Sequence, residues 1–197
     1  MDFTGAHDYI IERLRRELSP SLTYHTVEHT LDMHRAAIRL IEMEALKDDH
    51  LIKLIETASL YHDTGMLVSY KDHETQSVII AGEVLPGFGY TKEEVDEIAG
   101  LILVTRLPQR PNTLPEKILC DADLDSLGRE DFFLQSFQLH HEWKLNGIFQ
   151  STLEEWLRFE VKFFTEHEYF TRSARKLRQE LKQKNLAEIT DILERLK

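Results

Sequence analysis

Apolar residues recur every three or four positions along most of this chain of 197 residues. This spacing is typical of one face of an α-helix. Segments that follow it span residues 5–18, 26–46, 48–62, 73–85, 91–105, 116–127, 130–147, 151–168 and 171–196. No stretch sustains the two-residue alternation that indicates a β-strand. The sequence therefore predicts an all-α protein, built as a single helical bundle.

Residues at the segment ends support these boundaries. Thr91 is followed three positions later by Glu94, which predicts a capping box, and Asp48 or Asp49 can cap the segment 48–62. Residues 106–115, RLPQRPNTLP, contain three prolines and predict a loop. The polar segment 171–196 has only a thin apolar stripe. It is expected to pack on the outside of the bundle. The alternative is that it contacts a partner, as in a homodimer.

The composition excludes several classes of function. A net charge of −11 argues against binding to nucleic-acid polymers or anionic membranes. Cys120 is the single cysteine, so neither an intrachain disulfide nor a cysteine-based zinc site can form. The chain shows no secretory signal and no apolar run of the roughly 18–20 residues that a membrane span needs, so we expect a cytoplasmic protein. The negative net charge does not exclude a small anionic substrate, because a bound metal can make the electrostatic potential inside a pocket positive.

Histidines and aspartates concentrate in three short segments, YHTVEHT, SLYHDTG and KILCDADLDSLG. In the second, His62 is the last member of an apolar stripe, so its ring is expected to point inward. Adjacent residues within a straight helix diverge by about 100°. Asp63 can face the same cavity only if the helix ends here, and Gly65 allows the chain to leave sharply.

Helix geometry distinguishes the acids of the third segment. Asp121 and Asp123 are two positions apart, so they point to nearly opposite sides. Asp123 has Leu119 and Leu127 one turn away on either side and is predicted to be the inward acid, where a cation is its natural partner. Asp121 has the more polar surroundings and is expected to cap, to pair with a lysine or to lie behind the ligands.

His25 and His29, in the first segment, lie one helical turn apart on one face. Both could bind one metal, as in zincins, but Thr26 stands where the zincin motif has glutamate. The alternative is that one histidine binds the metal while the other handles a proton. His29 lies deeper in the helix, and His25 is nearer its N-terminal end. His34 is predicted to pack in the core, and surface or structural roles are expected for His7, His50, His140, His141 and His167.

The order of these motifs resembles the HD superfamily of metal-dependent phosphohydrolases, which has an all-α fold. The resemblance covers about residues 24–128, with the helices of 130–197 completing a single domain of residues 1–197. YHTVEHT is also similar to a segment of the cyclic-nucleotide phosphodiesterases, a branch of the same superfamily. The resemblance implies metal ligation by His29, His62, Asp63 and Asp123, and a general-acid role for His25.

The resemblance further implies hydrolysis of a phosphate ester or anhydride, in a nucleotide or related small molecule. Asp63 or Asp123 would steer the attacking water. His73 fits the first additional histidine of two-metal branches, but Thr105 stands where the second is expected, so one ion is favoured over two. A mixed nitrogen and oxygen site suits Mn, Fe, Zn, Ni, Co or Mg.

Remaining assignments concern residues around the site. His73, Asp121 and Thr105 are predicted to contact substrate or to support the ligands, and Arg106, Arg110 and Arg129 are candidate phosphate contacts, since guanidinium groups match phosphate geometry. Ordinary surface arginine is the alternative for the three. Two other functions stay open: a non-catalytic domain that keeps the metal and binds a ligand, and the di-iron oxygenase branch of the superfamily.

Overall fold

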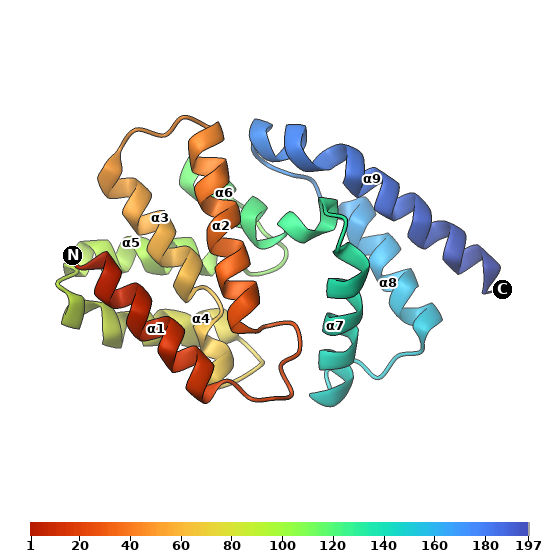
Figure 1. Cartoon of the computed structure of the whole chain (residues 1–197), viewed down its shortest axis with the longest axis horizontal. Helices are drawn as coiled ribbons and strands as arrows, with labels where there is room; N and C mark the ends of the chain where they lie inside the picture. The colour runs from red at the N-terminus through yellow and green to blue at the C-terminus, as the bar shows by residue number, and fades with distance from the viewer. Residues whose placement is uncertain (197) are drawn as a thin grey trace.

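The computed structural model describes residues 1–196, and this part of the chain is helical without any β-strand (Figure 1). The α-helices are α1 (Phe3–Glu17), α2 (Val27–Met43), α3 (Asp49–Tyr61), α4 (His73–Val84), α5 (Lys92–Leu103), α6 (Leu114–Asp123), α7 (Phe132–Leu145), α8 (Leu153–Glu166) and α9 (Arg172–Arg195). Short 3-10 helices follow α3, α4 and α6: η1 (Thr64–Leu67), η2 (Leu85–Phe88) and η3 (Asp125–Gly128). The prediction of an all-α fold is confirmed.

The helix ends follow the caps expected from the sequence, with one difference at α6. The Asp48 carboxylate accepts hydrogen bonds from two backbone N–H groups of α3, and Thr91 and Glu94 form the predicted capping box of α5. Helix α6 begins inside the predicted loop, because Thr113 caps it and Pro115 suits its first turn. It also ends four residues early, at Asp123, where Leu124 leaves helical geometry. Asp123 therefore stands at a helix end.

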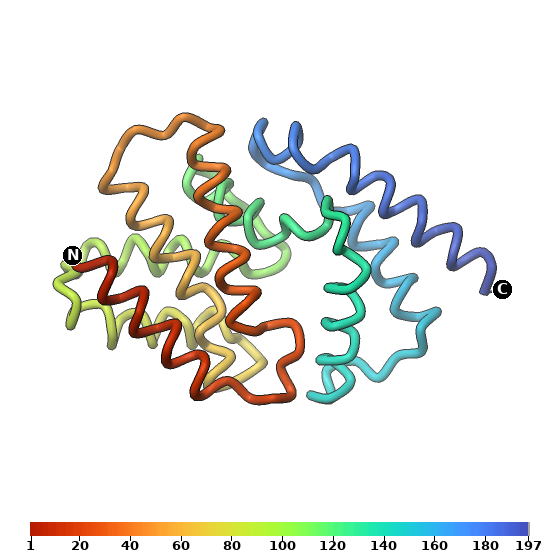
Figure 2. Tube along the Cα trace, in the orientation of Figure 1, coloured from red at the N-terminus to blue at the C-terminus, as the bar shows by residue number. Residues whose placement is uncertain are grey.

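Two separate hydrophobic clusters organise the molecule. Helices α1–α6 supply most of the first, which includes Leu40, Leu54 and Ile118. The second is formed around Phe132, Trp156, Leu157, Phe164 and Ile189 of α7, α8 and α9, together with Leu127 and Leu193. In Figure 2 the first group of helices lies on the left and the second on the right, with the two labelled chain ends on opposite sides. The sequence prediction that α9 packs on the outside agrees with its position against α8 and η3.

Polar side chains join the two groups around η3. Both oxygens of the Asp121 carboxylate accept backbone N–H groups, from Phe170 at 2.8 Å and Thr171 at 2.7 Å, where the chain enters α9. Arg178 of α9 donates to both oxygens of Asp125, at 2.7 and 2.8 Å. A Cβ at Gly128 would overlap the backbone of Arg178, so only glycine permits this close approach. Helix α6 is thus anchored to the C-terminal helices.

No helix among residues 1–196 combines the length and the apolar character that crossing a bilayer requires.

Candidate functional site

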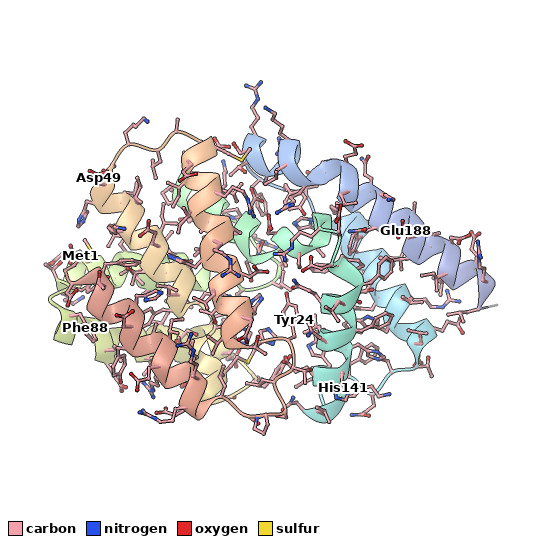
Figure 3. The ribbon with its side chains drawn as sticks, in the orientation of Figure 1. Met1, Tyr24, Asp49, Phe88, His141 and Glu188 are labelled. Atoms are coloured by element: carbon pink, nitrogen blue, oxygen red, sulfur yellow. The ribbon has the colours of Figure 1, made fainter. Side chains whose placement is uncertain are left out.

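The three motifs of the sequence meet at one place. His29 comes from the first turn of α2, His62 and Asp63 from the junction of α3 with η1, and Asp123 from the last residue of α6. Nitrogen and oxygen atoms of His29, His62 and Asp123 all lie within 4.8 Å of one another. Tyr24, labelled in Figure 3 between α2 and α7, borders this cluster, with its ring centroid 4.7 Å from that of His29.

Asp63 lies at the centre of the cluster. Its Oδ2 is 3.1 Å from Nε2 of His62 and 3.3 Å from Nε2 of His29, and its Oδ1 is 3.2 Å from Nε2 of His73. Burial acts to raise the pKa of Asp63, but the charge of His62 and the close approach of the three imidazoles hold it well below its usual value. Asp63 is therefore an ionised carboxylate that faces three imidazoles.

Local backbone geometry explains how two adjacent residues face one point. His62 keeps helical angles, whereas Asp63, with φ −108° and ψ 10°, has left the helix. Gly65 then lies so close to the carbonyl of His73 that a Cβ would collide with it, which draws the start of α4 against η1. The same contact brings His73 to the cluster.

The cluster favours a bound cation. Burial acts to lower the pKa of His62, but the negative charges of Asp63 and Asp123 outweigh it and raise this pKa to about 9. Burial has the largest effect on Asp123 and raises its pKa. The charge of His62 lowers this pKa, and the charge of Asp63 raises it. Two carboxylates this close need positive charge between them, either protons or a metal ion.

The donor set fits a divalent metal. The Nε2 atoms of both His29 and His62 are buried without a hydrogen-bond partner, so they are free to bind an ion. Nδ1 of His62 donates to the carbonyl oxygen of Ser59 at 2.9 Å, the arrangement that commonly orients a ligating histidine. With Asp63 and Asp123, two imidazole nitrogens and two carboxylates suit a transition metal better than calcium.

His25 stands beside this cluster and is held by a residue that the sequence analysis did not single out. Its Nδ1 donates to Oε1 of Glu142 in α7, and its Nε2 lies 3.8 Å from Oδ2 of Asp63. The other oxygen of Glu142 accepts the backbone N–H groups of Tyr24 and His25, at 2.8 and 3.0 Å, and Tyr70 donates to Oε1 at 2.7 Å. His25 therefore presents Nε2 to the site, because Nδ1 is engaged.

The Glu142 side chain is completely buried. Burial acts to raise its pKa, but the hydrogen bond and charge of His25 and the backbone N–H groups outweigh it, so the pKa lies below the usual value. Glu142 is thus an ionised carboxylate that fixes both the ring orientation of His25 and which nitrogen faces the site.

Under the phosphohydrolase function that the sequence resemblance implies, replacing Glu142 by glutamine is expected to lower the turnover of an alkyl phosphate by about 10- to 100-fold, as when a metal-bound histidine loses its carboxylate partner. An amide cannot stabilise a positively charged His25. The effect should nearly vanish with p-nitrophenyl phosphate, whose leaving group needs no proton, and a purely structural role of Glu142 would lower both rates equally. Steady-state kinetics with the two esters decide between these outcomes.

A cavity of about 210 Å³ opens from the cluster toward α7 and α8. Its polar end is formed by His25, His29, Asp63, His73 and Asp123, and its other end by aromatic and aliphatic side chains. The cavity gives a bound molecule access to the candidate ligands from one direction, with His25 on its wall.

Other predicted site residues take different places. Thr105 lines the cavity, and its hydroxyl donates to the carbonyl of Ile102. Arg106 lies outside the cavity lining and donates to Thr75, and Arg110 is on the same outer loop. Arg129 pairs with Asp32 and Asp131, and Asp121 holds the start of α9, so neither reaches the cavity.

The remaining histidines show contacts outside the cluster. Nδ1 of His34 lies 2.9 Å from Oγ of Ser59, which agrees with packing in the core. The ring of His140 stacks on Trp156 with centroids 4.8 Å apart, while His141 is exposed.

Sequence reasoning missed several residues of the site region, among them Glu142, Glu160 and Gln109, whose Nε2 donates to Oδ2 of Asp123 at 3.0 Å. Glu142 lies 117 positions from His25 in sequence and has no motif around it, so no local pattern indicates it. Glu160 is different, because it interrupts the apolar stripe of residues 156, 159, 160, 163 and 164 on α8. A lone acid on such a face is visible in the sequence.

Comparison with known proteins establishes the fold. No protein-family model and no curated protein matches the sequence. YpgQ of Bacillus subtilis, whose structure was solved in complex with ADP, aligns over 95% of this chain and 96% of its own, with a TM-score of 0.65 and 20% identity. A predicted HD superfamily hydrolase from an uncultured Thermotogales bacterium aligns over 96% and 90%, with a TM-score of 0.58 and 20% identity. The HD-type fold expected from the motifs is confirmed.

Proposed function

We propose that this chain, which has the fold of an HD superfamily hydrolase, is a metal-dependent phosphohydrolase of small phosphate esters or anhydrides. One observation carries the proposal. Two buried imidazole nitrogens without partners, from His29 and His62, face the carboxylates of Asp63 and Asp123 at the end of a cavity. Such a set of unsatisfied ligands in a pocket is the arrangement expected of a metal centre.

His29, His62, Asp63 and Asp123 would hold the metal, which when bound supplies a water of lowered pKa and polarises a phosphoryl oxygen. The protein residues do the rest. One oxygen of Asp63 lies 3.1 Å from His62 and the other 3.2 Å from His73, so the carboxylate is held where it can orient a water next to the ligands. His73 donates Nδ1–H to the carbonyl of Tyr70 at 3.1 Å and thereby keeps Nε2 toward Asp63.

Proton delivery to the leaving group is assigned to His25. Its side chain keeps 13% of its exposure, so a substrate in the cavity can reach Nε2, whereas Nδ1 is engaged by Glu142. An ionised, buried carboxylate behind an imidazole stabilises the protonated ring and directs its free N–H outward. This is the arrangement of a general acid.

The complex of YpgQ with ADP supports phosphoanhydrides as substrates worth testing, since ADP contains such a bond. Nucleotides, cyclic nucleotides and simple aryl phosphates form the first screen. Because the chain carries a net charge of −11, we propose that its substrate is a small molecule rather than a nucleic acid.

Removal of metal is expected to lower the rate of hydrolysis at least about 100-fold, since a metal supplies several kcal/mol of transition-state stabilisation. The protein would be treated with a chelator, dialysed, and assayed after adding Mn, Fe, Zn, Ni, Co or Mg ions one at a time. We expect activity to return with at least one ion, at one ion per chain by elemental analysis.

Unchanged activity after verified metal removal would contradict the proposal. Two iron atoms per chain with oxygen consumption would instead support the oxygenase alternative. Metal binding without hydrolysis of any compound in the screen would support a ligand-binding role.

A further inference from the structure

Aromatic rings form a wall of the far half of the cavity, beside aliphatic side chains such as Leu127 and Leu139. Trp143 comes from α7, and Trp156, Phe159 and Phe163 follow one face of α8. Ring centroids of Trp143 and Trp156 are 5.4 Å apart and those of Trp156 and Phe159 are 5.3 Å apart, so the rings form a continuous wall. We call this half the aromatic chamber.

One carboxyl group faces the chamber with an oxygen that has no hydrogen-bond partner. Glu160 lies in the middle of the apolar face of α8, lines the cavity and is only 6% exposed. Its Oε2 is buried and makes no hydrogen bond. Burial raises the pKa of Glu160 to about 7, although a contact with Ser136 acts the other way. A buried carboxyl oxygen left unpaired destabilises the fold, so this position favours an occupant that donates a hydrogen bond to it.

The charged residues that line the cavity indicate which kind of ligand would satisfy Glu160. At the polar end of the cavity, the carboxylates of Asp63 and Asp123 have histidines as partners and are the proposed metal ligands. Among the described residues, no lysine or arginine lines the cavity, so Glu160 has no counter-charge. Aromatic faces attract cations as well, and a cation enclosed by rings and a carboxylate gains from both.

The volume limits the size of the ligand. A cavity of about 150 Å³ in a protein core binds benzene. The whole cavity here measures about 210 Å³, including the space at the metal ligands. It therefore accommodates one ring or a short chain with a small substituent.

We infer that the aromatic chamber binds a small organic ammonium group, which donates to Oε2 of Glu160 while the rings enclose its carbon atoms. Together with the proposed function, on which this step rests, the inference identifies the substrates as phosphate esters whose organic part carries an amine. The metal end takes the phosphate, and the chamber selects the leaving group.

Binding can be measured without metal or catalysis, because the two tryptophans of the chain, Trp143 and Trp156, both line the chamber. Benzylamine and benzyl alcohol, matched in size, would be titrated against the intrinsic fluorescence of metal-free protein. We expect benzylamine to bind at least tenfold more tightly. In Glu160→Gln the two should differ by less than twofold, whereas Glu166→Gln, an exposed position on the same helix, should keep the wild-type preference.

Equal binding of the two probes to the wild type, or an unchanged preference in Glu160→Gln, would overturn the inference. Removing a buried charge leaves no cavity, so the glutamine variant should fold, as circular dichroism would verify. If it does not fold, Glu160→Leu serves the same comparison.

Kinetics then test the substrate class. With metal present, 4-(aminomethyl)phenyl phosphate should show a kcat/KM at least tenfold above that of 4-(hydroxymethyl)phenyl phosphate, and Glu160→Gln should remove the difference. Hydrolysis of both esters at equal rates by the wild type would overturn the inference and leave the hydrolase proposal standing. Hydrolysis of neither would count against the proposed function, while the benzylamine titration still decides on the chamber.

Discussion

Asp123→Asn and Asp121→Asn, two positions apart on α6, are expected to affect different properties: the first should lower activity and metal content, and the second should lower stability. The Asp123 variant loses a proposed metal ligand, so kcat/KM should fall roughly a thousandfold and metal content should drop. Its metal-free form should melt at a temperature close to that of the metal-free wild type. The amide replaces a carboxylate whose charged form is disfavoured by burial and by Asp63, and favoured by His62. Elemental analysis and thermal melts measure the two quantities.

Asp121→Asn is the matched control. Its carboxylate accepts the backbone N–H groups of Phe170 and Thr171, and an amide can replace only one of these bonds. The expected loss is about 1–3 kcal/mol, which lowers Tm by roughly 2–4 °C for each kcal/mol in a protein of this size. Metal content and kcat should stay near the wild type. If Asp123→Asn keeps both metal and activity, the assignment of the metal centre is wrong.

His25→Ala should have the second largest effect, and its size should depend on the substrate. A positioned general acid contributes about 10²- to 10⁴-fold, so an alkyl phosphate, with a strongly basic leaving oxygen, should react slower by that factor. p-Nitrophenolate leaves without a proton, so hydrolysis of p-nitrophenyl phosphate should fall by less than about tenfold. His141→Ala, exposed on α7 and labelled in Figure 3, should leave both rates unchanged.

Combining the change with Glu142→Gln sharpens this test. If Glu142 acts through His25, the double variant should be no slower than His25→Ala alone, because residues that work as a unit are not additive. Equal losses on both esters for His25→Ala would show that the histidine does not deliver the leaving-group proton.

The sequence predicts the helices because they depend on local spacing, and the resemblance to the HD superfamily implies the convergence of the candidate ligands. Asp123 could be distinguished from Asp121 by helical geometry alone, and His62 with Asp63 by the position of a helix end. The true end of α6 could not be predicted, because Leu124 leaves the helix where the apolar pattern continues.

Glu142 escapes prediction for a different reason. Its contacts with His25 and Tyr70 join α7 to segments more than 70 positions earlier. Such a partner depends on how the second hydrophobic cluster docks on the first. Arg129 is a candidate phosphate contact by residue type, and in the structure Asp32 and Asp131 engage its guanidinium group. Such pairing also depends on distant segments of the chain.

The two hydrophobic clusters share no residue, and this division separates the proposed metal ligands from the proposed binding chamber. The proposed ligands are set by helices of the first cluster, whereas the aromatic walls belong to the second, with Glu142 as a link between them. A change of ring size on α8 would thus repack the second cluster without moving the proposed metal ligands. The chain is accordingly a favourable scaffold for redesign: other occupants of the chamber could be accommodated by altering α8 alone, with the proposed metal ligands and His25 kept as they are.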